Sequence, residues 1–217
     1  MEIVICCFGV LMGLGEAAII KYMLLRRSIV CSSVILWQRT ALISVITGIC
    51  FVIAYIKLGW RLSLIHALVF ICFLIVIAAI DFWYGLIIRP VIVAMLVTGF
   101  VMAMFSFTNF SFEMADLIIG CSVGGSCLFL LAWGSGKMGY GDAWFAAALG
   151  LWLGWQALLM LLWLAFLSGG VVGVILLATG VKNRKDPIPF GPFLAIAAFI
   201  AYFYYSDMII FIGQLYL

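Results

Sequence analysis

Long apolar runs, separated by short polar or charged stretches, fill almost the whole chain. Most of these runs approach the roughly 20 residues that an α-helix needs to cross a bilayer. Because backbone polar groups inside lipid must be bonded within their own segment, we expect the runs to be helices. The expected helices cover residues 3–25, 37–56, 62–80, 91–107, 117–133, 143–153, 157–178 and 192–212. The pattern predicts an all-α integral membrane protein, a single transmembrane domain over residues 1–217 with about eight spans.

Composition agrees with this prediction and excludes several classes of protein. Of the 217 residues, 69% are hydrophobic and 9% are charged, whereas soluble domains have about 45–50% apolar and about 25% charged residues. The chain has too few charges to solvate its own surface, which argues against a disordered, nucleic-acid-binding or ordinary cytosolic protein. The lipid bilayer is therefore the first expected partner, and no nucleic acid is expected.

The distribution of basic residues predicts the orientation of the helices. Eight spans place Arg26, Arg27, Arg89, Lys137, Lys182, Arg184 and Lys185 on one side of the membrane, and Lys57, Arg61, Glu113 and Asp116 on the other. Cytoplasmic loops are enriched in Lys and Arg, so the first side is expected to be cytoplasmic. Both termini then lie outside. A seven-span count would merge two runs and scramble this asymmetry.

Two aspartates stand at the predicted cytoplasmic edge. Asp81 closes the third run and Asp142 opens the sixth, 61 residues later. Ionisable residues at membrane depth are costly and indicate a functional site. Two carboxylates that meet in a pocket of low dielectric cannot both ionise readily, so one keeps a proton. Such a pair can activate water and polarise a peptide carbonyl, although a carboxylate at a helix N-terminus, as at Asp142, is also favoured structurally.

Glycines next to Asp142 favour the catalytic interpretation. The sequence Gly139-Tyr140-Gly141-Asp142 places glycine three residues and one residue before the carboxylate. Because glycine allows close approach of another backbone, both positions could admit an extended substrate. Lys137 could bind substrate or support this loop, although the charge asymmetry explains it equally. The seven cysteines include no C-x-x-C pair, so neither a zinc site nor any other metal or cofactor is expected.

These residues resemble the prepilin peptidases, membrane aspartic proteases with a G-x-G-D motif. The likeness is strongest over residues 81–195 and includes residues 137–142, 146–150 and 153–156. The most specific element is Ile-Pro-Phe-Gly-Pro-Phe-Leu-Ala at residues 188–195. The family's two catalytic aspartates would correspond to Asp81 and Asp142.

The resemblance implies endoproteolysis at the cytoplasmic face of a bacterial inner membrane. Substrates would be type IV prepilins or pilin-like secretion subunits, cut between a basic leader peptide and an apolar helix. The chain resembles a short form without the family's cytoplasmic tetracysteine domain, so N-methyltransferase activity is not expected. An alternative from the residues alone is a small proton-coupled transporter in which the paired carboxylates relay protons.

Overall fold

Helices account for the apolar runs in the computed structural model, which describes residues 1–26, 33–104, 114–135, 139–183 and 186–215. The helices are α1 (Glu2–Arg26), α2 (Ser33–Leu58), α3 (Leu62–Tyr84), α4 (Arg89–Met104), α5 (Met114–Ser135), α6 (Tyr140–Ala178) and α7 (Gly191–Leu215). No strand occurs within these described ranges. The predicted all-α class is therefore confirmed.

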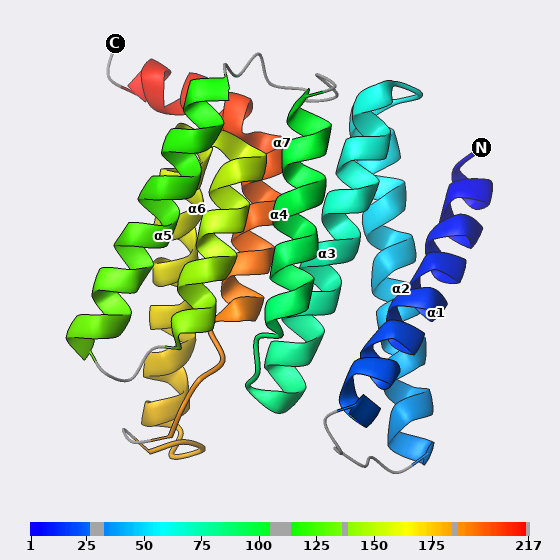
Figure 1. Cartoon of the computed structure of the whole chain (residues 1–217), viewed down its shortest axis with the longest axis horizontal. Coiled ribbons are helices and arrows are strands. Elements are labelled where there is room, and N and C mark those ends of the chain that lie inside the picture. Colours follow the sequence, from blue (N-terminus) through cyan, green and yellow to red (C-terminus); the bar gives the residue numbers. More distant parts are fainter. Residues whose placement is uncertain (27–32, 105–113, 136–138, 184–185, 216–217) are drawn as a thin grey trace.

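The predicted runs 143–153 and 157–178 both lie within α6, which is 39 residues long. Gly154 interrupts its helical geometry with φ 76° and ψ 170°, a backbone conformation open mainly to glycine. Both ends of α6 lie at the lower end of the bundle in Figure 1, so the chain turns back on itself near Gly154. The two predicted runs are thus separate helical segments, 140–153 and 155–178, joined at Gly154.

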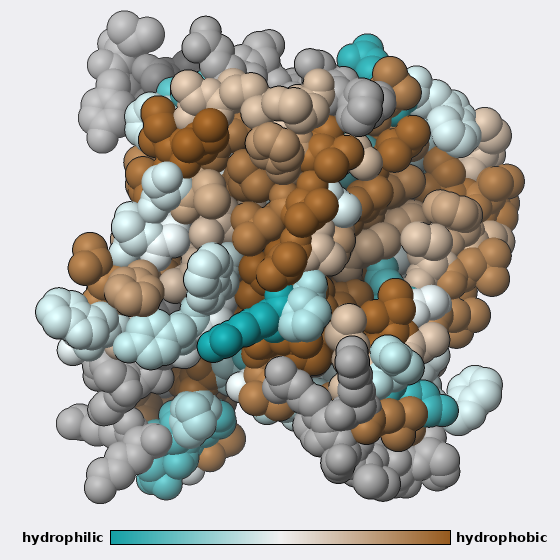
Figure 2. Space-filling view, viewed as in Figure 1, coloured by the Kyte–Doolittle hydropathy of each residue, from teal (hydrophilic) through white to brown (hydrophobic). Residues whose placement is uncertain are grey.

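Five helices among the described residues are long and apolar enough to cross a membrane, namely α1, α2, α3, α5 and α6. α4 and residues 191–205 of α7 are apolar but shorter. Hydrophobic side chains cover most of the face in Figure 2, and many large ones are exposed, including Ile3 at 78% and Val174 at 67%. Exposed apolar surface of this extent is typical of contact with lipid. The count of eight spans stays a prediction.

Successive helical segments alternate in direction (Figure 1), so α1 begins and α7 ends at the same end of the bundle. Arg26, Arg89 and Lys182 lie at or beside helix termini of the opposite, lower end. The remaining predicted cytoplasmic residues, Arg27, Lys137, Arg184 and Lys185, lie outside the described residues. Which end faces the cytoplasm stays a prediction.

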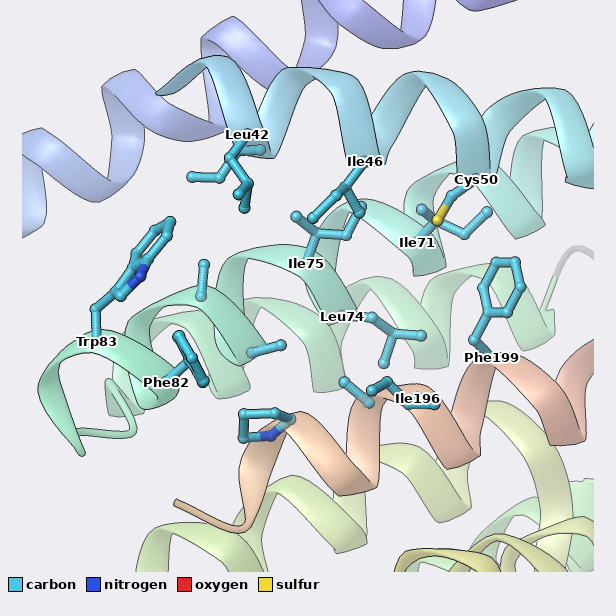
Figure 3. Close-up of a pocket in the computed structure, with 15 residues that line it drawn as sticks. Leu42, Ile46, Cys50, Ile71, Leu74, Ile75, Phe82, Trp83, Ile196 and Phe199 are labelled. Atoms are coloured by element: carbon cyan, nitrogen blue, oxygen red, sulfur yellow. The ribbon is translucent and has the colours of Figure 1, made fainter. Parts of the chain in front are cut away.

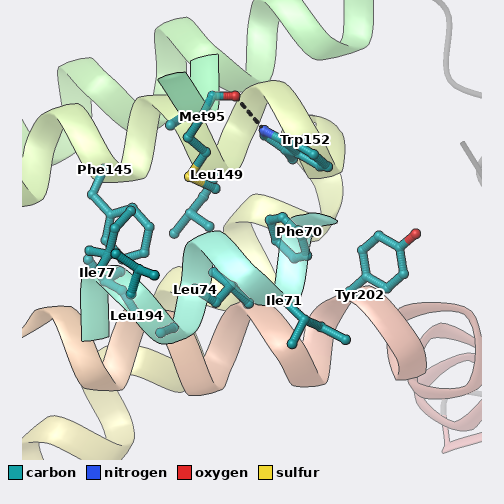
Figure 4. Close-up of a cluster of buried hydrophobic side chains, with 14 of the residues drawn as sticks. Phe70, Ile71, Leu74, Ile77, Met95, Phe145, Leu149, Trp152, Leu194 and Tyr202 are labelled. Carbon is teal, nitrogen blue, oxygen red and sulfur yellow. Dashed lines mark hydrogen bonds between the residues drawn. The ribbon is translucent and has the colours of Figure 1, made fainter. Parts of the chain in front are cut away.

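The core is built around α3, which contacts α1, α2, α4 and α7. Figure 4 shows Phe70 and Leu74 of α3 among buried side chains of α4, α6 and α7. Trp152 of α6 donates an indole hydrogen bond of 2.9 Å to the carbonyl oxygen of Met95 in α4. This bond satisfies a polar group that would otherwise be buried without a partner. The bond thereby fixes α6 relative to α4.

Glycines bring the backbones of α5 and α6 into direct contact. A Cβ atom built on Gly150 would overlap the carbonyl group of Gly120. A Cβ on Gly124 would lie 2.5 Å from the carbonyl oxygen of Ala146 and 3.0 Å from the side chain of Leu158. α5 therefore touches both segments of α6, as small residues at membrane helix interfaces allow.

This contact predicts that Gly150→Ala destabilises the protein. The added methyl group would force the backbone of α5 away, and overpacking of this kind costs about 1–3 kcal/mol. We expect a lower melting temperature in detergent than for Gly134→Ala, because a Cβ on Gly134 would have no neighbour within 4 Å in the described part of the chain. Equal melting temperatures for the two variants would show that α5 and α6 do not pack through these backbones.

Candidate active site

Asp81 lies in the last turn of α3, which ends at a left-handed glycine. Gly85 has φ 59° and ψ 30°, and its N–H donates to the backbone carbonyl of Asp81 over 2.8 Å. Glycine at this position commonly ends a helix because it adopts the left-handed conformation without a steric penalty. The Asp81 side chain is nevertheless only 5% exposed. The helix end thus holds the carboxylate inside the protein rather than in solvent.

Asp142 lies in the first turn of α6. Gly139 precedes the helix, and its carbonyl oxygen accepts a 3.1 Å hydrogen bond from the backbone N–H of Asp142. A carboxylate in the first turn is stabilised by the positive end of the helix dipole. The side chain is 7% exposed, and its Oδ1 atom is buried without a hydrogen-bond partner among the described residues.

The structure brings these two predicted site residues together. α3 ends and α6 begins at the same end of the bundle (Figure 1), and the Asp142 carboxylate lies within the electrostatic influence of Asp81. Repulsion between two buried carboxylates opposes ionisation of both at once. No group of three or more His, Cys, Asp or Glu side chains suited to a metal occurs in the described ranges. The chemistry that the site offers is that of a carboxylate pair.

A third element completes the site, and the sequence did not assign it. The backbone N–H of Gly191, the first residue of α7, donates a 2.8 Å hydrogen bond to Oδ2 of Asp81. Gly191 belongs to the octapeptide 188–195 that carried much of the family resemblance. The motif therefore pointed to this part of the chain, but the sequence did not show that Gly191 contacts Asp81.

The two glycines before Asp142 have different surroundings. A Cβ on Gly141 would lie 2.7 Å from Cβ of Ile87, which belongs to the connection between α3 and α4. A Cβ on Gly139 would have only Asp142 and Gly141 atoms nearby, the closest being Oδ2 of Asp142 at 3.6 Å. Gly141 thus packs against the loop that follows Asp81, whereas the space beside Gly139 is open as far as the described residues show. Lys137, the remaining predicted site residue, lies outside the described residues.

An apolar groove of about 520 Å³ lies between α2, α3 and α7. Figure 3 shows Leu42 and Ile46 of α2 on one side, Ile75 of α3 below them, and Ile196 of α7 opposite. At one end the groove is lined by Phe82 and Pro192, which adjoin the hydrogen-bonded residues Asp81 and Gly191 in the sequence. None of the fifteen described residues that line it is charged.

Arg39 of α2 lies close to this end of the groove. Its guanidinium group donates a 2.7 Å hydrogen bond to the hydroxyl of Tyr84 and lies 4.9 Å from the ring centroid of Trp83. Trp83 also lines the groove. The lining of the groove is thus apolar, and the polar groups of Arg39 and Tyr84 lie close to the end formed by Phe82 and Trp83.

About half of the chain matches a known protein family. Residues 68–174 match the family model described as the Type IV leader peptidase family. This range contains both Asp81 and Asp142, and it confirms the resemblance to prepilin peptidases found in the sequence. No solved structure matches the chain.

Individual relatives carry related names. The chain is 29% identical over 110 residues to a prepilin leader peptidase/N-methyltransferase of Xanthomonas campestris, an alignment that covers 48% of this chain and 38% of the relative. It is 39% identical over 74 residues to the protein of that name from Pseudomonas aeruginosa, which covers 34% and 26% of the two chains. The leader peptidase HopD of Escherichia coli is 35% identical over 95 residues, which covers 40% of this chain and 61% of HopD. The aligned parts thus span less than two thirds of these curated relatives.

The two motif glycines should differ in their effect on stability. We predict that Gly141→Ala lowers the melting temperature in detergent, because its methyl group would collide with Ile87 and such overpacking costs about 1–3 kcal/mol. Gly139→Ala is the matched control and should melt near the parent temperature. A stable Gly141→Ala protein would contradict the proposed packing of the loop after Asp81.

Proposed function

The chain carries the type IV leader peptidase pattern over residues 68–174, and on that premise we propose that it is a membrane-embedded aspartic endopeptidase. Its substrates would be type IV prepilins or pilin-like secretion subunits, from which it removes the leader peptide. The observation that carries the proposal is the burial of Asp81 and Asp142, which come from distant parts of the chain, at the same end of the helix bundle.

The proposed reaction is direct attack of water on the scissile peptide. One carboxylate, ionised, removes a proton from water while the water oxygen bonds to the carbonyl carbon. The other, protonated, donates a hydrogen bond to the carbonyl oxygen as negative charge develops there. When the tetrahedral intermediate collapses, the C–N bond breaks and the leaving amine takes up a proton from the carboxyl that accepted one. The pair shares one proton, and its roles belong to the pair rather than to either residue.

The surroundings of the two carboxylates support this mechanism. Oδ2 of Asp81 accepts the N–H of Gly191, whereas Oδ1 of Asp142 is buried and has no hydrogen-bond partner among the described residues, so its capacity to form a hydrogen bond is unused there. The space beside Gly139 lies next to Asp142. An extended substrate backbone could approach the pair there, which fits the substrate-binding role predicted for this glycine.

The groove suggests how the substrate is oriented. Its uncharged lining suits the apolar segment that follows the cleavage site, and its catalytic end lies beside Asp81 and Gly191. The basic leader would extend into the cytoplasm on the side of the basic loops. Cleavage at the cytoplasmic face of the bacterial inner membrane follows if the basic residues orient the helices as predicted.

Replacing either carboxyl group by an amide should abolish cleavage. We predict that Asp81→Asn and Asp142→Asn, each alone, leave a co-expressed prepilin uncut, because an amide cannot exchange the required proton. Electrophoresis of the substrate detects the loss of the leader, and an immunoblot of membranes checks that each variant accumulates. Asp116→Asn, at the opposite end of the bundle in α5, should cleave normally. Cleavage by either single variant would contradict the proposed catalytic pair. A prepilin that the parent chain leaves uncut would favour the alternative function of a proton-coupled transporter.

Filling the groove should weaken substrate binding. We predict that Ile75→Trp, in the middle of the groove, raises KM at least about 10-fold with a smaller effect on kcat, because it removes binding shared by the ground and transition states. Ile65→Trp is the matched control, since Ile65 lies on the same helix but is 52% exposed. The measurement is cleavage at several mole fractions of prepilin in liposomes. An unchanged KM for Ile75→Trp would exclude the groove as a substrate site.

A further inference from the structure

The first turn of α7 presents one backbone amide to the catalytic pair. Gly191 N–H donates to Oδ2 of Asp81 over 2.8 Å. The next residue, Pro192, has no N–H to offer. The N–H groups of Phe193 and Leu194 both donate to the carbonyl oxygen of Phe190 over 3.1 Å. In this turn, the Gly191 amide is therefore the group that is directed at the carboxylate.

The site leaves no room for a side chain at Gly191. A Cβ atom built there would lie 2.7 Å from Oδ2 of Asp81 and 3.0 Å from both its Cβ and its Cγ. The backbone conformation does not explain the glycine, because Gly191 is absent from the described residues with positive φ. The glycine is explained by close approach to the carboxylate.

Aromatic side chains on either side fix this turn against α6. The ring of Phe190 lies 5.1 Å from the ring of Phe166. A Cβ built on Gly169 would lie 3.5 Å from the ring of Phe190 and 3.6 Å from that of Phe193. α6 also carries Asp142 in its first turn. One helix thus bears one carboxylate and anchors the turn that holds the other.

From this arrangement we propose that Gly191 is a positioning residue that holds Asp81 in the geometry needed for proton exchange, an inference that rests on the proposed function. A methyl group at Gly191 would displace the Asp81 carboxylate, because Oδ2 is the nearest atom at 2.7 Å, and Cβ and Cγ at 3.0 Å would have to shift by only a few tenths of an ångström. Misplacement of a reacting group by about 1 Å can lower the rate about 100-fold. The substitution should therefore impair chemistry much more than folding.

The test compares Gly191→Ala with Gly170→Ala in liposomes that contain a prepilin at several mole fractions. For Gly191→Ala we predict a kcat about 10–100-fold below that of the parent, with KM within about twofold and a similar melting temperature, since the lost interaction acts in the transition state. Gly170→Ala should match the parent, because a Cβ on Gly170 would have no neighbour within 4 Å. A Gly191→Ala protein with the kcat of the parent would overturn the proposal.

A second measurement keeps the proposal testable if Gly191→Ala destabilises the protein. Asp81→Gly removes all three side-chain atoms that the new methyl group would meet. The loss of melting temperature caused by Gly191→Ala should then disappear in the Asp81→Gly background, whereas an equal loss in both backgrounds would overturn the proposal. This thermal comparison needs no cleavage. A parent chain that cuts no prepilin would therefore refute the proposed function while the contact between Gly191 and Asp81 is still tested.

Discussion

Repulsion between two buried carboxylates is the constraint on which the arrangement of this protein depends. Asp81 and Asp142 are 5% and 7% exposed and interact electrostatically, and burial of like charges is unfavourable unless other groups compensate. Each carboxylate interacts with a helix N-terminus, where partial positive charge gathers, although Asp81 itself lies in the last turn of α3. Asp142 occupies the first turn of its own helix, α6, while Asp81 receives the first amide of α7. The fold thus brings the N-termini of α6 and α7 to the carboxylate pair.

Close backbone packing makes this convergence possible. The turn at Gly154 sends α6 back along itself, so its two ends and the start of α7 all lie at the same end of the bundle as the end of α3. α5 packs against both segments through Gly120 and Gly124. Trp152 joins the first segment to α4 by its hydrogen bond to Met95. Rigid support of this kind is what a reaction that depends on the position of a proton requires.

Much of this organisation could be predicted from the sequence, because lipid imposes a simple rule on apolar runs. Those runs indicated the helices, and the two interrupting carboxylates indicated the site at one end of the bundle. The break at Gly154 falls between the two predicted runs 143–153 and 157–178, although both belong to α6. The contacts of Gly191 with Asp81 and of Gly141 with Ile87 could not be predicted, since each joins elements whose relative placement depends on tertiary packing.

The central claim is that Asp81 and Asp142 form one site within a single chain. The most direct test is to introduce Asp81→Cys and Asp142→Cys together after the seven native cysteines have been replaced by serine. Native membranes are then treated with a short bis-methanethiosulfonate reagent, and the modified chain is analysed by mass spectrometry. The account predicts an intramolecular cross-link between the two positions. Cysteines that each react with a monofunctional reagent but never become cross-linked would contradict it.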